Sequence, residues 1–325
     1  MNLDPDSASS LRLRVVELAA PRAMNGTGPL VAVGSAEHIE AAAAQAWLER
    51  ATFTLTEDET SDRRAVTVPS VEDAVRSLAE RVDRWPQAAA ICDDVLRSID
   101  PDAPTYAGLV TESLAYSTLQ SGPEFADWLA QRGPALLTAS PEPVLVERHA
   151  DALTIRLNRP DRHNAFSTEM RAALLDALAV AYSDNEIRDV VLAGNGPSFC
   201  SGGDLAEFGS FDDPATAHFA RTRYSPALAL DELATRLGDG LIARVHGQVL
   251  GSGLEMAAFC GRVHADAQAR IGLPELELGL LPGAGGTLSI TRRIGRWRTA
   301  YLVLSGRIID AATALAWGLV DDVTQ

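Results

Sequence analysis

The second half of the chain alternates strand-like and helical segments, and this alternation constrains the fold more than any other feature of the sequence. From residue 144 onward, four strand-like runs occur: VLVERHADALTIRLNRP, DVVLAG, LIARVHGQVLG and RVHADAQARIG. Helical stretches are expected over 167–183 and 287–304. The segment DAATALAWG predicts a further short helix, with Asp310 as its N-cap and Gly318 as its stop. This pattern is typical of an α/β fold.

The first half of the chain is predicted to be largely helical. Residues 1–28 are expected to form a tail or a loosely attached strand, and 28–58 a strand, a helix and a strand. Helices are predicted over about 70–85, 86–99 and 105–131, the last with a break at Gly122-Pro123. A linker is predicted at 134–143. We therefore expect an N-terminal extension over 1–59, a helical region over 60–133 and an α/β core with the active site over 134–325.

Composition argues against several classes of function. The net charge of −16 opposes the phosphate attraction on which nucleic-acid binding mostly depends. The start of the chain lacks a basic and apolar leader, and no run of about 18 apolar residues occurs. We expect a cytoplasmic protein with neither a nucleic-acid nor a membrane partner.

The types of reactive residue narrow the chemistry further. All 28 basic residues are arginine, and the absence of lysine excludes Schiff bases, lysine-anchored pyridoxal phosphate, Ser-Lys dyads and the Walker A loop. Cys92, Cys200 and Cys260 are widely spaced, which favours buried thiols over disulfides or a zinc site. The six histidines have no metal-ligand spacing. We expect neither a metal nor a separate cofactor.

Two glycine-bearing segments are candidates for binding developing negative charge. In SFCSGGDLAEF, at 198–208, Gly202 and Gly203 leave no side chain between the backbone N–H groups and a ligand. In ARVHGQVLGSGLEMAAFC, at 243–260, the N–H of Ser252 is expected at the start of a helix, where unpaired donors favour an anion. Glu255 falls in the first turn of that helix, where it is either catalytic or simply favourable to the helix dipole.

A third segment supplies another carboxylate. In GLPELELGLLPGAGGT, at 272–287, Glu275 follows Pro274 within an apolar stretch. Burial there would raise its pKa and suit it to proton transfer near neutral pH. Glu277, two residues later, is the alternative candidate for proton transfer. A role as a plain surface acid is open for both glutamates.

Five segments across 144–325 together resemble the crotonase superfamily, the enoyl-CoA hydratase/isomerase family, in order and spacing. They are LNRPDRHNAF, FCSGGD, VHGQVLGSGLEMAAFCGRV, GLPELELGLLPGAGGT and LSGRIIDAATALAWGLVDDV. The resemblance implies a crotonase-like ββα spiral core that acts on an acyl-CoA thioester. It implies that the N–H groups of Gly203 and Ser252 form an oxyanion hole for the thioester oxygen, and that Glu255 and Glu275 are the acid and base. Substrate or CoA contacts are implied at Arg162, Asn164, Ala165, Cys200, Gly202, Asp204, Leu205 and Gly251. A homotrimer or a dimer of trimers is expected.

Several positions depart from the family pattern. Ser252 replaces a glycine, Ala206 stands where many members carry a basic residue, and His246 replaces an asparagine in a structural role. The CoA phosphates need other partners, and the arginines available, each of which is also a candidate for plain surface charge, are Arg159, Arg162, Arg292, Arg293, Arg296 and Arg298.

The helices that follow the core in this family have a counterpart at the front of this chain. Residues 66–132 resemble them, including a glutamate-bearing helix and the final PEF…WLAQR. The resemblance implies a circularly permuted crotonase whose first helices cover the active site of the same or a neighbouring subunit. The alternative is an unrelated or duplicated helical domain.

The expected reaction is hydration of a 2-enoyl-CoA, or the reverse dehydration. Double-bond isomerisation through Glu275 remains open, as do a thioester hydrolase with Ser252 and His246 and a non-catalytic acyl-CoA-binding protein. A dinucleotide site is disfavoured because GSGLEM lacks the third glycine of that turn. The acyl pocket is predicted within 205–236, with Phe211, Phe219, Tyr224 and Leu228 as lining candidates.

Overall fold

The computed structural model describes residues 11–22, 26–210 and 213–324. In this part of the chain, the N-terminal sheet is parallel with the order β1-β2-β3-β4: Arg14–Glu17, Leu30–Val33, Phe53–Thr56 and Ala65–Thr67. Between β2 and β3 lie α1 (Ala36–Glu40), the 3-10 turn η2 (Ala42–Ala44) and α2 (Gln45–Arg50). The strand, helix and strand predicted over 28–58 are therefore present, with the helix interrupted.

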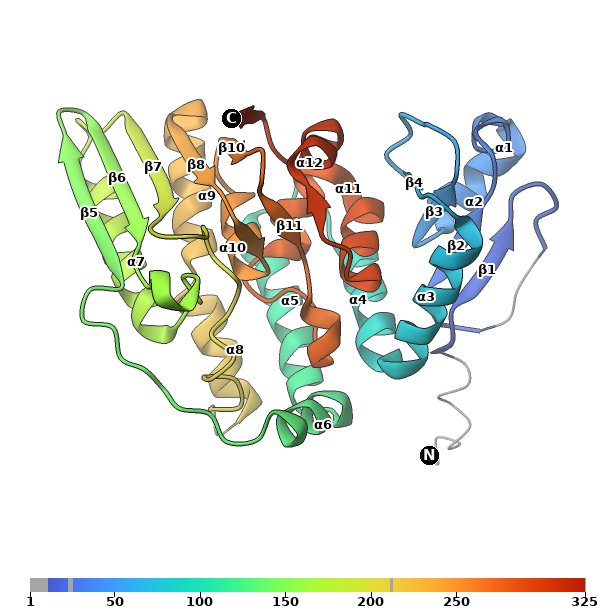
Figure 1. The fold of residues 1–325 in the computed structure, drawn as a ribbon, viewed down its shortest axis with the longest axis horizontal. Coiled ribbons are helices and arrows are strands. Elements are labelled where there is room, and N and C mark those ends of the chain that lie inside the picture. The colour runs from blue at the N-terminus through green and yellow to red at the C-terminus, as the bar shows by residue number, and fades with distance from the viewer. Residues whose placement is uncertain (1–10, 23–25, 211–212, 325) are drawn as a thin grey trace.

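The helical region follows this sheet. Its helices are α3 (Val71–Arg84), α4 (Pro86–Ser98), α5 (Thr105–Gln120) and α6 (Pro123–Arg132). The Ser70 hydroxyl caps α3 by accepting from the Asp73 N–H at 3.2 Å, and α4 and α6 each begin at a proline, whose missing N–H costs nothing in a first turn. Residues 133–142 contain no helix or strand and run from α6 to the first strand of the core (Figure 1).

The core contains a mixed six-stranded sheet and a small three-stranded one. The large sheet has the order β13-β10-β8-β7-β6-β5, with only β5 antiparallel to its neighbour. Its strands are β5 (Val144–His149), β6 (Ala152–Leu157), β7 (Asp189–Gly194), β8 (Leu241–Val245), β10 (Arg262–Asp266) and β13 (Asp322–Thr324). The small sheet has the order β12-β11-β9, with β9 (Gln248–Leu250), β11 (Arg270–Gly272) and β12 (Ile309–Asp310).

Helices alternate with these strands, as the sequence predicts for an α/β fold. They are α7 (Thr168–Ser183), α8 (Pro214–Arg223), α9 (Pro226–Leu237), α10 (Ser252–Ala257), α11 (Gly286–Ser305) and α12 (Ala311–Trp317), with 3-10 turns η3 (Pro160–Arg162), η4 (Gly238–Gly240) and η5 (Glu275–Leu278). Among the described residues, no helix is both long and apolar enough to cross a membrane.

One predicted strand is in fact two. The run LIARVHGQVLG divides into β8 and β9 at Gly247, whose φ of +56° favours glycine, and a β-carbon there would lie 2.0 Å from the carbonyl oxygen of Pro197. The break moves the chain from the large sheet to the small one. It thereby delivers the Gly251–Ser252 turn to the interior of the molecule.

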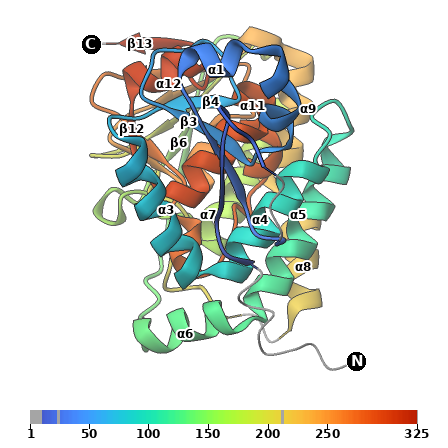
Figure 2. The same ribbon diagram turned by 90° about the vertical axis from the view of Figure 1, so that its right-hand side faces the viewer.

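The helical region packs on the core within the same chain. Helices α5, α11 and α4 stand between the four-stranded and six-stranded sheets, and α3, α4 and α5 lie side by side in the perpendicular view (Figures 1 and 2). Helix α11 contacts all three of them, and α5 also contacts α8. The predicted contact between residues 66–132 and the core is therefore present in cis.

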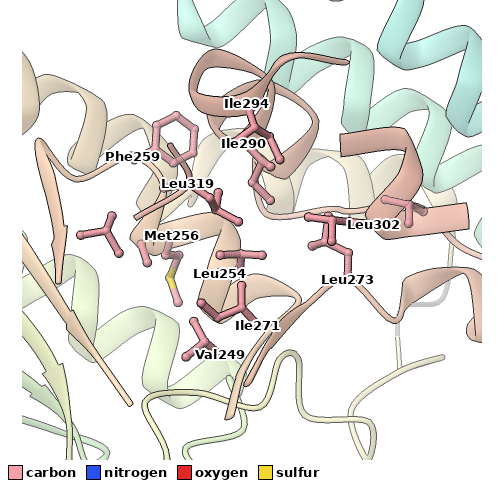
Figure 3. Close-up of a cluster of buried hydrophobic side chains, with 14 of the residues drawn as sticks. Val249, Leu254, Met256, Phe259, Ile271, Leu273, Ile290, Ile294, Leu302 and Leu319 are labelled. Carbon is pink, nitrogen blue, oxygen red and sulfur yellow. The ribbon is translucent and has the colours of Figure 1, made fainter. Parts of the chain in front are cut away.

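A cluster of buried hydrophobic side chains holds α10 in place. Val249 and Ile271 come from the small sheet, and Leu254 and Met256 come from α10; Figure 3 shows them close to Ile290 of α11. Each is at most 1% exposed, and burying such a side chain stabilises the fold by about 1.5–3 kcal/mol. The packing of these side chains therefore fixes the position of α10.

Candidate active site

A cavity of about 350 Å³ lies where the helical region meets the core. Tyr116 and Gln120 of α5 line it from the helical side. The core contributes the two glycine-bearing turns and the glutamates that the sequence singled out: Gly202, Gly203, Gly251, Ser252, Glu255 and Glu275. The candidate residues for charge stabilisation and proton transfer thus share one cavity.

The first turn, at Gly202 and Gly203, pairs with the backbone of Phe166. The Phe166 N–H donates to Gly202 O at 2.8 Å, and the Asp204 N–H donates to Phe166 O at 3.0 Å. Gly203 lies between these two bonds, and a β-carbon on it would lie 2.8 Å from the Phe208 ring. Within the described residues, its own N–H has no acceptor.

The second turn touches the first. Gly251 has φ +48°, and a β-carbon there would lie 3.5 Å from Cα of Gly202 and 2.5 Å from Oε1 of Glu275. Ser252 begins α10, and in the described part of the chain no group accepts its N–H. Two unpaired main-chain donors therefore stand on adjoining turns in the cavity wall, the arrangement that binds a developing oxyanion.

Glu255 is 2% exposed and sits in the first turn of α10. Its Oε2 accepts from the Ala284 N–H at 2.7 Å and from the Gly286 N–H at 2.8 Å. Burial raises the pKa of this carboxyl well above its usual range, and the charges of Glu112 and Glu275 raise it further, against the lowering effect of the two amides. Glu255 is thus oriented by the backbone and able to hold a proton.

Glu275 is 8% exposed and begins η5. Its Oε2 is buried with no hydrogen-bond partner among the described residues. Burial raises the pKa of Glu275 to about 8. Its competitor Glu277 pairs with Arg81 at 2.9 Å and has a half-exposed side chain, so Glu275 is the one suited to proton transfer.

A third glutamate, which the sequence did not single out as a site residue, completes the cluster. Glu112 of α5 is 2% exposed, and its carboxylate accepts from the Gly285 N–H at 2.7 Å and the Thr287 N–H at 3.0 Å. The Thr287 hydroxyl donates to it as well, at 2.7 Å. Burial raises the pKa of Glu112 to about 7. The only signal for it was the glutamate-bearing helix in the resemblance of 66–132 to the family's closing helices.

Comparison with known proteins identifies the family of the chain. The family model described as enoyl-CoA hydratase/isomerase matches residues 147–325. The chain is 38% identical over 180 residues to a 2,3-dehydroadipyl-CoA hydratase of Escherichia coli K12, covering 55% of this chain and 68% of the relative. It is 36% identical over 184 residues to a probable enoyl-CoA hydratase of Mycobacterium bovis, covering 56% and 68%. The chain belongs to the enoyl-CoA hydratase/isomerase family.

Solved structures support the same assignment. Pseudomonas aeruginosa DspI superposes with a TM-score of 0.52 at 31% identity, covering 58% of this chain and 70% of that one. An enoyl-CoA hydratase of Mycobacterium smegmatis gives a TM-score of 0.50 at 32% identity, covering 56% and 70%. The family, the α/β crotonase-like fold and the hydratase/isomerase type of enzyme predicted from the sequence are confirmed.

The contacts implied by the family resemblance divide into two groups. Gly202, Asp204, Leu205 and Gly251 line the cavity, whereas Arg162, Asn164, Ala165 and Cys200 are absent from its described lining. Asn164 and Cys200 are fully buried, and the Asn164 amide donates to the carbonyls of Asn195 and Ser198. The side chains of these two residues are therefore enclosed in the core, and their predicted contacts with substrate stay predictions. Contacts at Arg162 and Ala165 stay predictions.

The predicted phosphate-binding arginines mostly hold the fold together. Arg292 pairs with Asp231 at 2.9 Å and donates to the carbonyls of Pro101 and Ala103, and Arg296 donates to those of Glu49 and Ala51. Arg159, Arg292, Arg293, Arg296 and Arg298 are all missing from the described lining of the cavity. The arginines that do line it are Arg171 and Arg221, neither of which the sequence singled out.

The predicted acyl segment is only partly correct. Tyr224 lines the cavity, whereas Phe219 and Leu228 do not belong to its described lining, and Phe211 lies outside the described residues.

The hydrolase alternative is contradicted by the geometry. The Ser252 hydroxyl is buried without a partner in the described residues, and His246 Nε2 lies 2.9 Å from Gly196 O. His246, the base that this alternative requires, is therefore engaged elsewhere and is not positioned to activate Ser252.

Proposed function

We propose that the protein hydrates a 2-enoyl-CoA thioester, or dehydrates the 3-hydroxyacyl-CoA in reverse. One observation carries the proposal: two unpaired backbone N–H groups and two buried glutamates meet at a single cavity. A thioester carbonyl bound by both N–H groups can accept enolate charge, and one such donor contributes about 2.7–4 kcal/mol to the transition state.

Glu255 and Glu275 then carry out different proton transfers. Water adds to the β-carbon and gives one proton to Glu255, which must be ionised for this step and whose anionic form is favoured by the N–H groups of Ala284 and Gly286. Glu275, which is protonated below its raised pKa, gives its proton to the α-carbon of the enolate. One water is consumed, Glu255 gains the proton that Glu275 loses, and return of that proton from Glu255 to Glu275 restores the starting state.

Double-bond isomerisation is the second candidate. Glu275 Oε2 has no hydrogen-bond partner in the described part of the chain, so the same carboxyl is free to take a proton from one carbon and return it to another. Incubation with a 3-enoyl-CoA and detection of the conjugated 2-enoyl product would favour this reaction over hydration.

The test of the proposal is loss of enoyl absorbance when pure protein is mixed with 2-enoyl-CoAs of several lengths. Glu255→Gln and Glu275→Gln should each lower kcat by about 10²–10⁴-fold, the usual contribution of a general acid or base. Glu277→Gln is the matched control, because this residue lies on the same 3-10 turn with its carboxylate paired to Arg81. No absorbance loss with any 2-enoyl-CoA would refute hydration.

We further propose that the chain is a circularly permuted family member in which α3–α6 act as the helices that close the site. The presence of Tyr116 in the cavity wall and of Glu112 beside Glu255 supports this role.

A homotrimer or a dimer of trimers in the cytoplasm is the assembly we expect, and light scattering on the purified protein would test its size.

A further inference from the structure

Helix α6, at the bottom of the view in Figure 1, contacts the cavity wall that carries Glu275. The turn η5, which begins at Glu275, is followed by Gly279, whose φ of +69° favours glycine. A β-carbon on Gly279 would lie 2.7 Å from Cβ of Glu124 and 2.8 Å from the backbone N of Phe125, both in the first turn of α6. The backbone of α6 therefore comes as close to this wall as a glycine permits.

The last turn of α6 holds a second wall through Arg132. Leu205 and Phe208 line the cavity, and the Arg132 guanidinium donates to Leu205 O at 2.5 Å and to Phe208 O at 3.1 Å. The core holds the same segment at Glu207, whose Oε2 accepts from the N–H and the hydroxyl of Thr168, each at 2.8 Å. The segment is therefore fixed from two sides, by α6 and by the core.

Aromatic rings continue this contact from α6 to the candidate oxyanion hole. Phe125 is 2% exposed and stacks on Trp128, with the ring centres 5.7 Å apart. Trp128 meets the Phe208 ring edge to face at 5.9 Å, and the Arg132 guanidinium lies 5.4 Å from the centre of the Trp128 ring. The Phe208 ring in turn lies against Gly203, where a β-carbon would be 2.8 Å from it. Packed rings thus connect the buried Phe125 to the glycine of the first turn.

The Phe208 ring affects the site in two ways. It covers Gly203 and keeps water from that side of the turn, and a hydrogen bond to a developing oxyanion is stronger where water is excluded. It also restrains the turn, which Gly203 cannot do because it has no side chain. A donor misplaced by about 1 Å can lower the rate by about 10²-fold, so the position of this ring matters for the chemistry.

We propose that Arg132 and Trp128 are positioning residues for the enolate-forming step. They keep the Phe208 ring against Gly203, and the Gly203 N–H thereby keeps its direction towards the thioester oxygen. Neither Arg132 nor Trp128 belongs to the described lining of the cavity, so both act through Phe208 and not on the substrate. This inference rests on the proposed function of the cavity.

The first measurement is backbone hydrogen exchange, which needs no substrate. The amides of Ala206, Glu207 and Ser210 are hydrogen-bonded within the segment. In Arg132→Gln they should exchange about tenfold faster, the effect of one lost hydrogen bond, while the amides of α4 and α5 exchange as in wild type. Gln131→Ala, at the exposed neighbouring position, is the control and should change neither. Unchanged exchange in this segment, or exchange that rises equally in α4 and α5, overturns the proposal.

The second measurement follows the enolate itself. In D₂O the α-hydrogens of saturated hexanoyl-CoA exchange through the enolate, and mass spectrometry of the recovered thioester gives the rate. Arg132→Gln and Trp128→Leu should each lower this rate by about ten- to hundredfold. With 2-hexenoyl-CoA, kcat should fall by a similar factor and KM should change little, because the loss concerns the transition state. Trp128→Phe keeps a ring beside Phe208 and should recover most of the wild-type rate.

These measurements separate the positioning role from the hydratase reaction. If the wild type exchanges the α-hydrogens of hexanoyl-CoA but hydrates no 2-enoyl-CoA, hydration fails, and slower exchange in both variants still supports the positioning role. Equal exchange rates in wild type, Arg132→Gln and Trp128→Leu overturn the proposal. A wild type that exchanges no α-hydrogen overturns it as well, because no enolate is then formed.

Discussion

Glu112 and Glu255 bind alternate amides of residues 284–287, where a loop enters α11. Glu255 accepts from the N–H groups of Ala284 and Gly286, and Glu112 from those of Gly285 and Thr287. One carboxylate comes from the core and the other from the N-terminal helical region. The loop before α11 is thus fixed from both sides, and the helical region is joined directly to a candidate catalytic residue.

Truncation of Glu112 should therefore damage stability and activity together. Glu112→Ala leaves the buried N–H groups of Gly285 and Thr287 without acceptors, at a cost of about 1–3 kcal/mol for each. Urea unfolding should show a free energy of unfolding lower by roughly 2–5 kcal/mol, and kcat should fall because Glu255 loses its fixed loop. Thr118→Ala on the exposed face of α5 is the control. An unchanged unfolding midpoint would contradict this role of Glu112.

The pH dependence of activity should report the glutamate cluster as a unit. Burial raises the pKa of Glu255 well above its usual range, so acid pH leaves it without the negative charge that accepts the proton from water. Burial raises the pKa of Glu275 to about 8, so Glu275 loses the proton that it gives to the α-carbon as the pH rises through 8. We expect kcat/KM to rise with pH below 8, as Glu255 ionises, and to fall above pH 8. Glu112→Gln removes a neighbouring negative charge and should move this rise to lower pH. A pH profile that is flat over this range would show that the cluster does not control the reaction.

The free energy of unfolding should fall as the pH rises through the range in which Glu275 ionises. Its pKa is 4.5 in the unfolded chain and about 8 in the fold. The neutral form is therefore favoured by folding: its contribution is fully present below pH 4.5 and is lost as the pH rises through 8. The difference in free energy of unfolding between Glu275→Gln and wild type should favour the variant more at pH 9 than at pH 5. Urea midpoints at both values test this, with Glu277→Gln expected to show no such gain.

The sequence predicted many of the helices and strands because their signals are local. The Asp310 cap, the Gly318 stop and the break at Gly122-Pro123 each depend on neighbours in the chain, and the structure has them where the pattern indicates. The division of β8 from β9 was missed. It depends on Pro197, which is distant in sequence and whose carbonyl oxygen leaves no room for a side chain at Gly247.

The sequence predicted those site residues whose role depends on their neighbours in the chain. Gly203 and Ser252 follow from turn chemistry, and the apolar surroundings of Glu275 indicated its burial. Glu112 comes close to Glu255 through the packing of α5 on α11, and Arg221 lines the cavity from α8; periodicity reveals neither. The structural bonds of the Asn164 side chain to the carbonyls of Asn195 and Ser198 were not predicted, because a buried amide that bonds to carbonyls looks the same in sequence as one that binds a ligand.

Ser252→Ala separates the backbone role of this residue from a nucleophilic one. The Ser252 hydroxyl is buried beside the Cys200 thiol, at most a weak partner, and the proposed oxyanion contact uses only the N–H. The alanine variant should keep kcat within about threefold and be as stable as wild type or more stable, since an unpaired buried hydroxyl costs about 1–3 kcal/mol. Complete loss of turnover, with binding retained, would instead indicate a nucleophilic serine.

Asp204 tests whether a residue implied as a substrate contact is in fact structural. Its carboxylate forms an ion pair with Arg159 at 2.9 Å, both side chains are at most 4% exposed, and Arg159 also donates to Ala165 O at 2.6 Å. Asp204→Asn leaves the buried guanidinium without its counter-ion, so the free energy of unfolding should fall by about 3–5 kcal/mol. Asp161→Asn, at a nearby exposed position on η3, should be neutral. If Asp204→Asn instead raises KM while the unfolding free energy is unchanged, the residue binds substrate and its pairing with Arg159 adds little to the fold.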